Sequence, residues 1–461
     1  MASKVPYDVI VAGGGPAGTA AAIAAARTGA KTLVVDRWGF LGGMLTAGMV
    51  NPIHTFHNMR GEQIVGGIGH EIIKRLEQIG GVFPGGHLHS AYLSSFSHTP
   101  FDAESMKRVL IEMADEAGVH CLFHTIVLGA VVDEGYVKGI RVANKAGVYE
   151  VEAKVVVDCT GDGDVAADAG AVVEKGDRDG KCMAGSLMFR MGGVDPDAVV
   201  AYAKENPDDL VMAEDPFVKK TNRELAAEIR DVPDIHVVRG LFRLVSRAQA
   251  AGEFPLSRNQ IIFSFSPRRT EVYVNCTNVV HVDGSDVEQM SQAEIATRKQ
   301  VPEVANFLIK YIPGFTNAYV LDTACQIGPR ESRRIMGDYV LTGEDVLEGR
   351  RFADGIARGA YPSDIHGPDG GLVHRHIKDG RDYHIPYRCL TPKGLENILV
   401  AGRCISCDRI ALGSVRVMAQ CMATGEAAGT AAALAVAKAR TPRSMGGDAV
   451  VRSLKEHGAI L

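Results

Sequence analysis

Two arginines in this sequence have the spacing of an anion-binding pair. Arg330 follows Gly328-Pro329, and Arg333 comes three positions later. If this segment is helical, Arg330 and either Arg333 or Arg334 lie on one face and form a fork that suits a carboxylate or a phosphate. We therefore expect Arg330 and Arg333 to hold a small polar, anionic substrate. The alternative is a solvated helix start in which both arginines pair with nearby acidic side chains.

Histidines supply the candidates for proton transfer. His54 and His57 follow a glycine-rich loop, and imidazole is the side chain whose ordinary pKa lies nearest to neutral pH. Either histidine can instead line a pocket wall. His374 and His376 would share one face of a strand, a spacing that metals use, but no acidic or thiol partner completes a ligand set. We predict a polar loop there and no metal.

The N-terminal segment carries the glycine spacing of a dinucleotide-binding turn. Gly13 permits a tight turn, Gly15 lets the backbone approach a pyrophosphate, and Gly18 allows a helix to pack closely on a strand. Pro16 and Ala17 open that helix, whose N-terminus stabilises phosphate charge. The alternative is a glycine-rich corner with a purely structural role.

The elements around this turn form a predicted strand–helix–strand unit. A buried strand over 9–12 precedes the turn, an alanine-rich helix covers 16–29, and a second strand covers 31–36. Asp36 ends the second strand, where a carboxylate accepts hydrogen bonds from a ribose diol and repels a 2′-phosphate. The sequence therefore predicts a nucleotide with a free ribose diol and disfavours NADP.

Further segments distinguish FAD from NAD. The doublet Gly42-Gly43, the strand end Thr160-Gly161 and the run Gly402-Arg403, taken with the glycine turn, resemble the glutathione-reductase-type FAD fold. The resemblance is closer to its branch of fumarate reductase flavoproteins and bacterial FAD-dependent oxidoreductases, and it covers both ends of the chain. It implies that FAD is the cofactor and assigns to it Gly13, Gly15, Pro16, Ala17, Gly18, Asp36, Arg37, Gly42, Gly43, Met44, Thr46, Val127, Thr160, Gly161, Asp162, Gly402, Arg403, Ser414, Val415 and Arg416.

The same resemblance extends to two C-terminal segments. Ser414 is expected to cap a helix over 414–438 whose N–H groups point at the flavin, where the helix dipole favours the reduced anion. Arg416 opposes that dipole unless an anion lies beside it, and the alternative is that Arg416 points outward to an acidic surface residue. The segment from His384 to Tyr387 resembles one that re-enters the cofactor domain, so we expect His384 and Tyr387 to face the substrate.

The expected architecture is α/β. Residues 1–171 and 386–461 are predicted to form a discontinuous, glutathione-reductase-type, Rossmann-like FAD-binding domain with a parallel sheet. Short strands over 119–123, 126–132, 137–142 and 148–151 are predicted to form a small antiparallel crossover layer, followed by a sheet strand over 153–158. Residues 172–385 lack repeated strand–helix–strand units and are predicted to be an inserted α+β substrate domain.

Composition limits the partners. A net charge of −5 offers no basic field for nucleic acid or an anionic membrane. Nine cysteines suit reduced thiols, and the N-terminus has no pattern of a targeting signal, so we expect a cytoplasmic protein. A second glycine turn of this type is missing, so electrons are expected to pass to or from an external donor or acceptor. The oligomeric state stays open, with a homo-oligomer among the options.

Two functions follow from these patterns. The first is an FAD-dependent dehydrogenase or reductase that exchanges hydride between flavin N5 and a small polar, anionic substrate. The second is an FAD-holding electron-transfer subunit of a multi-protein redox complex, which the scattered cysteines and the missing NAD domain motivate.

Overall fold

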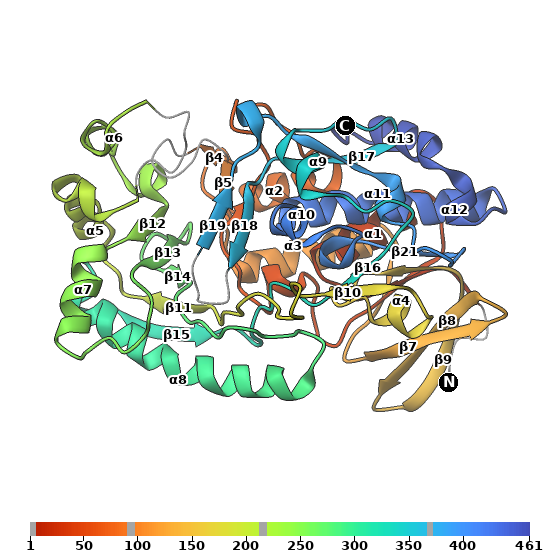
Figure 1. The fold of residues 1–461 in the computed structure, drawn as a ribbon, viewed down its shortest axis with the longest axis horizontal. Coiled ribbons are helices and arrows are strands. Elements are labelled where there is room, and N and C mark those ends of the chain that lie inside the picture. The colour runs from red at the N-terminus through yellow and green to blue at the C-terminus, as the bar shows by residue number, and fades with distance from the viewer. Residues whose placement is uncertain (1–5, 90–96, 212–218, 367–371) are drawn as a thin grey trace.

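The computed structural model describes residues 6–89, 97–211, 219–366 and 372–461, and its central element is a seven-stranded sheet (Figure 1). Five strands are parallel, in the order β6–β2–β1–β9–β21. The side chains of β1 and β2 are buried almost throughout, which accounts for their continuous apolar runs. The seven strands are β1 (Tyr7–Ala12), β2 (Thr32–Val35), β6 (His120–Leu122), β7 (Ile126–Asp133), β8 (Tyr136–Asn144), β9 (Gly147–Asp158) and β21 (Ile398–Val400).

Strand β9 joins the parallel sheet to a small antiparallel layer. Its first half pairs with β8, which pairs with β7, and its second half lies between β1 and β21. The predicted crossover layer is therefore present, but segments 148–151 and 153–158 are one strand. The sequence also places 119–123 in this layer, and that is wrong: β6 lies at the edge of the parallel sheet, because a strand that follows helix α3 (Ala103–Glu116) returns parallel.

Helices α1 (Pro16–Arg27) and α11 (Met418–Ala437) pack closely together against the sheet (Figure 1). A Cβ at Gly425 would lie 2.0 Å from the carbonyl oxygen of Ala17, and one at Gly429 would lie 2.0 Å from that of Ala21. Small residues on both helices thus let the two backbones approach. The other helices of this part of the chain are α2 (Gly67–Gln78), α3, α4 (Asp164–Asp168), α9 (Gly343–Leu347), α10 (Arg409–Val415), α12 (Pro442–Met445) and α13 (Gly447–Glu456).

A second sheet and its helices lie to one side of the first (Figure 1). Its strands pair antiparallel in the order β12–β13–β14–β11–β15. This part has the mixed α+β character expected of the inserted segment, and the domain boundaries stay a prediction. Its elements are α5 (Pro196–Glu205), α6 (Asn222–Glu228), α7 (Phe242–Ala250), α8 (Val287–Tyr311), β11 (Phe189–Gly192), β12 (Val237–Gly240), β13 (Ile261–Phe265), β14 (Val272–Val274) and β15 (Tyr319–Thr323).

Small sheets connect the two parts and carry several polar side chains. They are β3–β5–β4, β10–β16, β17–β20 and β18–β19. No described helix is both long and apolar enough to cross a bilayer. The strands are β3 (Ile53–His54), β4 (Leu88–His89), β5 (Ser97–Thr99), β10 (Val173–Lys175), β16 (Arg333–Ile335), β17 (Gly355–Gly359), β18 (Ser363–His366), β19 (Leu372–Arg375) and β20 (Tyr383–Pro386).

Candidate functional site

A cavity of about 1020 Å³ opens at the carboxyl ends of the parallel strands, which is the usual ligand position in open α/β sheets. Its wall on the sheet side includes Gly13, Gly15, Pro16, Ala17, Asp36, Arg37, Gly43, Met44, Val127, Thr160, Gly161, Asp162, Gly402 and Arg403. Its other wall includes His54, His98, Ser186, Arg239, Arg258, Asn275, Asn278, Arg330, Tyr361, Asp364, His374 and Arg416.

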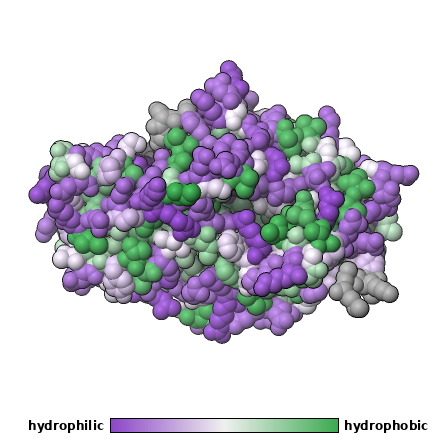
Figure 2. All heavy atoms as spheres, turned by 90° about the horizontal axis from the view of Figure 1, so that it is seen from below, coloured by the Kyte–Doolittle hydropathy of each residue, from purple (hydrophilic) through white to green (hydrophobic). Residues whose placement is uncertain are grey.

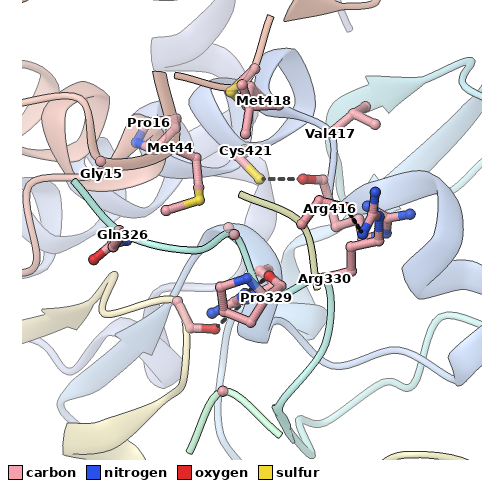
Figure 3. A pocket seen from close by; sticks show the side chains of 18 of the residues that line it. Gly15, Pro16, Met44, Gln326, Pro329, Arg330, Arg416, Val417, Met418 and Cys421 are labelled. Atoms are coloured by element: carbon pink, nitrogen blue, oxygen red, sulfur yellow. Dashed lines mark hydrogen bonds between the residues drawn. The ribbon is translucent and has the colours of Figure 1, made fainter. Parts of the chain in front are cut away.

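Gly15 and Gly18 of the glycine turn differ in their surroundings, because Gly15 borders open space and Gly18 is in close contact with the protein. A Cβ on Gly15 would meet no protein atom within 4 Å, whereas one on Gly18 would lie 1.7 Å from the carbonyl oxygen of Gly13. Gly18 therefore serves helix–strand packing, and it does not line the cavity. Gly15, Pro16 and Ala17 line the cavity, so the N-terminus of α1 lies at its wall (Figure 3). No side chain caps this end of the helix, so its first N–H groups suit a phosphate.

Asp36 closes the end of β2 beside this turn. Its carboxylate accepts the backbone N–H groups of Gly14 at 2.7 Å and Trp38 at 2.8 Å. Burial raises the pKa of Asp36 above the ordinary value for aspartate, although both hydrogen bonds oppose that shift. Arg37 and Val127 line the cavity nearby. This end of the cavity has the carboxylate and the space that a ribose diol requires.

The two glycines of the doublet Gly42-Gly43 have different roles. Gly43 lines the cavity, and Met44 projects beside Gly15 and Pro16 (Figure 3). Gly42 has φ +107, and a Cβ there would lie 2.7 Å from the side chain of Thr46. The hydroxyl of Thr46 donates to the carbonyl oxygen of Leu41 at 2.7 Å. Gly42 and Thr46 therefore shape the loop from behind and do not line the cavity.

Arg403 ties the ends of two sheet strands together. Its Nε donates to the carbonyl oxygen of Gly161 at 2.9 Å, and its Nη2 donates to the carboxylate of Asp162 at 2.5 Å. Thr160, Gly161 and Asp162 follow β9, and Gly402 with Arg403 follows β21, so all five lie at one edge of the cavity. Arg403 is held by protein acceptors, which fixes the shape of this edge.

The expected role of Ser414 as a helix cap is wrong. Ser414 lies inside α10, its Oγ is 2.7 Å from the hydroxyl oxygen of Tyr383, and neither Ser414 nor Val415 lines the cavity. Asp408 caps α10 by accepting the N–H of Ala411 at 2.7 Å, so the helix begins before Ser414.

Near the C-terminus, the helix whose N-terminus faces the cavity is therefore α11. It starts at Met418, with Val417 at its cap position and no side-chain acceptor there. Val417, Met418 and Cys421 line the cavity, and the thiol of Cys421 lies 3.3 Å from the carbonyl oxygen of Arg416 (Figure 3). The predicted helix dipole is present at the cavity, but it begins four residues later than expected.

Arg416 lies on the cavity wall in an ion pair. Its Nη2 is 3.1 Å from the carboxylate of Asp364, which also lies 3.2 Å from Nε2 of His374. Arg416 therefore has an acidic partner, as one alternative anticipates, but the pair is buried at the cavity and not on the outer surface. Its Nε has no hydrogen-bond partner within the part of the chain that the structure describes.

Arg330 lies beside Arg416 on the same wall (Figure 3). Its Nη1 donates to the carbonyl oxygen of Ala184 at 2.7 Å and to the hydroxyl of Ser186 at 3.0 Å, and both acceptors are neutral. Burial, reinforced by the nearby charge of Arg416, lowers the pKa of Arg330 to about 9. Among the described residues no carboxylate forms a salt bridge with Arg330, so its charge is available to a ligand.

Arg333 does not form the predicted fork with Arg330. Residues 333–335 are strand β16, whose backbone pairs with β10 instead of forming a helix. Nε of Arg333 donates to the carbonyl oxygen of Asp162 at 2.8 Å, and its Nη2 pairs with Asp164. Arg333 lines the sheet side of the cavity, whereas Arg330 lines the opposite wall.

The predicted proton-transfer residues separate into one that lines the cavity and three that do not. His54 lines the cavity, and burial lowers its pKa to about 4. His57 lies 3.1 Å from Oγ of Ser97, His384 lies 3.2 Å from the carbonyl oxygen of Phe352, and the hydroxyl of Tyr387 donates to Pro442 at 2.8 Å. None of these three residues lines the cavity, so the structure gives no support to catalytic roles for His57, His384 and Tyr387, and those roles stay predictions.

Sequence patterns missed several polar residues of the substrate-side wall. His98, Tyr361 and Asp364 come from short strands or loops with no periodic signal. Asn275 follows β14, and its Oδ1 has no hydrogen-bond partner among the described residues. Among those residues no group of three or more histidine, cysteine, aspartate or glutamate side chains could hold a metal ion.

Parts of the chain are similar to known proteins. Digeranylgeranylglycerophospholipid reductase of Methanosarcina acetivorans is 27% identical over 170 residues, which cover 34% of this chain and 38% of that protein. Dihydrolipoyl dehydrogenase of Trypanosoma brucei brucei is 41% identical over 75 residues, which cover 14% of this chain and 16% of that protein. These matches span less than half of either relative.

Several solved structures align with most of the chain, and one of them is described here. It is a geranylgeranyl bacteriochlorophyll reductase-like protein from Thermoplasma acidophilum, with 14% identity, a TM-score of 0.49, and coverage of 98% of this chain and 82% of that one. The sequence model of the family described as FAD dependent oxidoreductase matches residues 8–456. The chain therefore belongs to the FAD dependent oxidoreductase family, and its cofactor is FAD.

Proposed function

We propose that this FAD-dependent oxidoreductase oxidises or reduces a small polar, anionic organic substrate that binds against Arg330. The observation that carries the proposal is the charge of the substrate-side wall. Arg239, Arg258, Arg330 and Arg416 line it, and Asp364 is the acidic residue of that wall. Arginines in a cavity repel one another, so an anionic ligand stabilises the arrangement.

Arg330 is the residue best placed to hold that anion. Its hydrogen bonds to Ala184 and Ser186 fix the guanidinium group without neutralising it, which leaves its remaining N–H groups for a carboxylate. Arg416 next to it is already paired with Asp364. Arg330 therefore binds and orients the substrate, whereas Arg416 and Asp364 set the shape of the wall.

The sheet-side wall supplies a complementary set of groups for the cofactor. The N-terminus of α1 faces the part of the cavity that suits a pyrophosphate, Asp36 suits a ribose, and the N-terminus of α11 carries about half a positive charge. Bound FAD supplies the two-electron oxidant or reductant. The helix end at Val417 and Met418 stabilises negative charge that develops beside it.

The name of the relative from Methanosarcina acetivorans indicates a prenyl lipid as its substrate. A polar substrate fits the wall of this cavity better than such a lipid. Asn275, Asn278 and Gln260 add amide groups between the arginines. An isoprenoid chain would remove water from these half-buried amides and from the arginines without offering them hydrogen bonds, which is costly. The match to that relative also covers 34% of this chain.

The electron-transfer alternative receives less support from the cysteines that motivated it. Cys404 and Cys407 are buried, and burial raises the pKa of both thiols. Among the described residues no group of three or more histidine, cysteine, aspartate or glutamate side chains could hold a metal ion, so these cysteines do not assemble the ligand set of an iron–sulfur cluster there. We therefore favour an enzyme with its own small-molecule substrate.

The proposal is tested by following the absorbance of bound FAD under anaerobic conditions. The purified holoenzyme is mixed with a panel of 2-hydroxy acids and neutral sugars, and the dithionite-reduced enzyme is mixed with enoates. We expect a carboxylate compound to change the flavin redox state and neutral sugars to leave it unchanged. Rapid turnover of a neutral sugar, with no response to any acid, would contradict the proposal.

A further inference from the structure

Arg258 is a second arginine of the cavity that has no acidic partner in the described ranges. It lies in the loop between α7 and β13, where Ser257, Asn259 and Gln260 also line the cavity. Its Nη1 donates to the carbonyl oxygen of Cys276 at 3.4 Å. Its Nε and Nη2 make no hydrogen bond within the described part of the chain, and neither atom is buried from solvent. These donors are therefore available to a ligand in the cavity.

The loop that carries Arg258 is held by neighbouring elements of the second sheet. Nε2 of Gln249 on α7 donates to the carbonyl oxygens of Leu256 and Arg258, each at 2.9 Å. Nε of Arg239 on β12 donates to Oε1 of Gln260 at 2.9 Å. The backbone on both sides of Arg258 is thus fixed, so less conformational entropy is lost when its side chain binds an anion.

The anchor points of the two arginines are neighbours on one wall. Arg330 donates to Ser186, which lies just before β11, and the loop arginine donates to Cys276, which lies just after β14. The residues that follow these two anchors, Leu187 and Thr277, are bonded to each other. The N–H of Leu187 donates to Oγ1 of Thr277, and that hydroxyl donates to the carbonyl oxygen of Leu187, each at 2.8 Å. One ligand can therefore lie between the two guanidinium groups.

These two positive charges act on each other. Burial is the main cause that lowers the pKa of Arg330 to about 9, and the charges of Arg416 and Arg258 contribute to the same shift. Asp364 pairs with Arg416, so the excess positive charge of this wall lies at Arg330 and Arg258. A substrate with one anionic group compensates one of these two arginines, whereas a second anionic group compensates the other.

We propose that Arg258 binds a second anionic group of the substrate, so that the substrate is an acid that carries a further carboxylate or phosphate. The inference rests on the proposed function, in which Arg330 holds the first carboxylate. A guanidinium group presents paired N–H donors that fit either kind of anion. Arg258 is thus a specificity-determining residue, which selects doubly charged substrates and takes no part in the redox step.

Calorimetric titration of the oxidised holoenzyme tests the proposal without turnover. Malonate, succinate and glutarate are each compared with their own monoamide, which keeps the length of the ligand and removes one charge. We expect at least one diacid to bind about 10- to 100-fold more tightly than its monoamide, because hydrogen bonds between charged groups are among the stronger ones. Equal affinities in all three pairs, or no binding by any diacid, would overturn the proposal.

A fourth ligand distinguishes the two kinds of second anion. In 3-phosphonopropionate one carboxylate of succinate is replaced by a phosphonate, and the rest of the carbon chain is unchanged. Tighter binding of 3-phosphonopropionate than of succinate would assign Arg258 to a phosphate group, and the reverse order would assign it to a carboxylate. Both orders support the proposal, provided that the tighter ligand also exceeds the monoamide of succinate by about tenfold or more.

Variants of the two arginines assign the preference to Arg258. Arg258→Met should bind the best dianion and its monoamide within about threefold of each other, whereas Arg258→Lys, which keeps the charge, should retain most of the preference. Arg330→Met should weaken the binding of both ligands. Arg247→Met is the matched control, because this arginine of α7 is exposed and does not line the cavity. Melting temperature and the ratio of flavin to protein absorbance show that each variant is folded and loaded.

Three results would contradict the assignment of Arg258. An unchanged preference in Arg258→Met would place the second anion elsewhere, and a loss of bound FAD from this variant would show that Arg258 serves the cofactor. If singly charged acids bind and reduce the flavin with no preference for a second charge, this inference fails while the proposed function stands. If no acid of either charge binds, the proposed function fails as well.

Discussion

At the scale of single residues, Gly15 and Gly18 are glycines for different reasons. Gly18 has no room for a Cβ because the carbonyl of Gly13 occupies its place, and Gly15 has room that the protein does not use. Both positions could be predicted from the motif, because its spacing reports backbone geometry. The difference between the two positions could not be predicted from the motif, because it depends on which atoms lie near each glycine in the folded structure.

The Gly15→Ala variant should separate folding from cofactor binding. The backbone at Gly15 has φ −67, which alanine adopts readily, so the stability of the apoprotein should stay equal or rise by about 0.5 kcal/mol. The added methyl group would occupy the phosphate cradle, so the affinity for FAD should fall. Thermal unfolding of the apoprotein and titration with FAD measure the two effects. A lower melting temperature with unchanged FAD affinity would contradict this account.

Glu426 makes stability depend on pH. It is buried in α11, it accepts the N–H of Ile68 at 3.0 Å, and burial raises its pKa to about 7. The folded state therefore binds a proton that the unfolded state loses near pH 4.5, so stability present at low pH is lost as the pH rises through about 7.

The Glu426→Gln variant should remove this loss of stability at higher pH, because glutamine does not titrate. Its amide oxygen can still accept the backbone N–H of Ile68. The free energy of unfolding of the wild type should decrease by up to about 3 kcal/mol more than that of the variant between pH 4.5 and pH 8. Urea unfolding at both pH values provides the comparison. Identical pH dependence in the two proteins would exclude Glu426 as the titrating group.

At the scale of elements, the structure differs from the sequence prediction where a helix breaks and where a strand pairs with a distant segment. The region around Ser414 has helical composition on both sides, so the break between α10 and α11 has no local signal. The residue type of Arg330 is enough to predict an anion-binding role. The position of Arg333, by contrast, depends on the pairing of β16 with β10, a long-range contact that turns its side chain away from Arg330. Periodicity does not report such contacts.

The contact between α1 and α11 should be the element most sensitive to a single methyl group. In Gly425→Ala the new Cβ would lie 2.0 Å from the carbonyl oxygen of Ala17. We expect a loss of about 1–3 kcal/mol in stability and a lower FAD content, because both helix N-termini would shift. Thermal unfolding and the ratio of flavin to protein absorbance measure these effects. Wild-type stability would show that the two helices can separate without cost.

At the scale of the whole molecule, the cavity unites segments from both ends of the chain. The glycine turn and the 402–418 segment line it together, and the second sheet supplies much of the opposite wall. The parallel sheet and the use of FAD could be predicted because their motifs are local. On the face drawn in Figure 2, hydrophilic residues lie between the apolar groups.

Because segments far apart in sequence line one cavity, FAD bound in that cavity should stabilise the entire fold. Apoprotein supplied with FAD at 100 times the dissociation constant should gain about 2.7 kcal/mol. The melting temperature should rise with the logarithm of the FAD concentration, and Gly15→Ala should require more FAD for the same shift. A melting temperature that is independent of FAD would contradict a cofactor that joins these segments.

The central claim, that Arg330 selects an anionic substrate, is tested most directly by a matched pair of compounds. The fastest acid of the panel and its primary amide are compared in anaerobic flavin reduction by the wild type and by Arg330→Met. We predict that the acid reacts with the wild type roughly 30- to 150-fold more efficiently than the amide, equivalent to about 2–3 kcal/mol, and that Arg330→Met abolishes this preference. Equal rates for acid and amide in the wild type, or an unchanged preference in the variant, would contradict the claim.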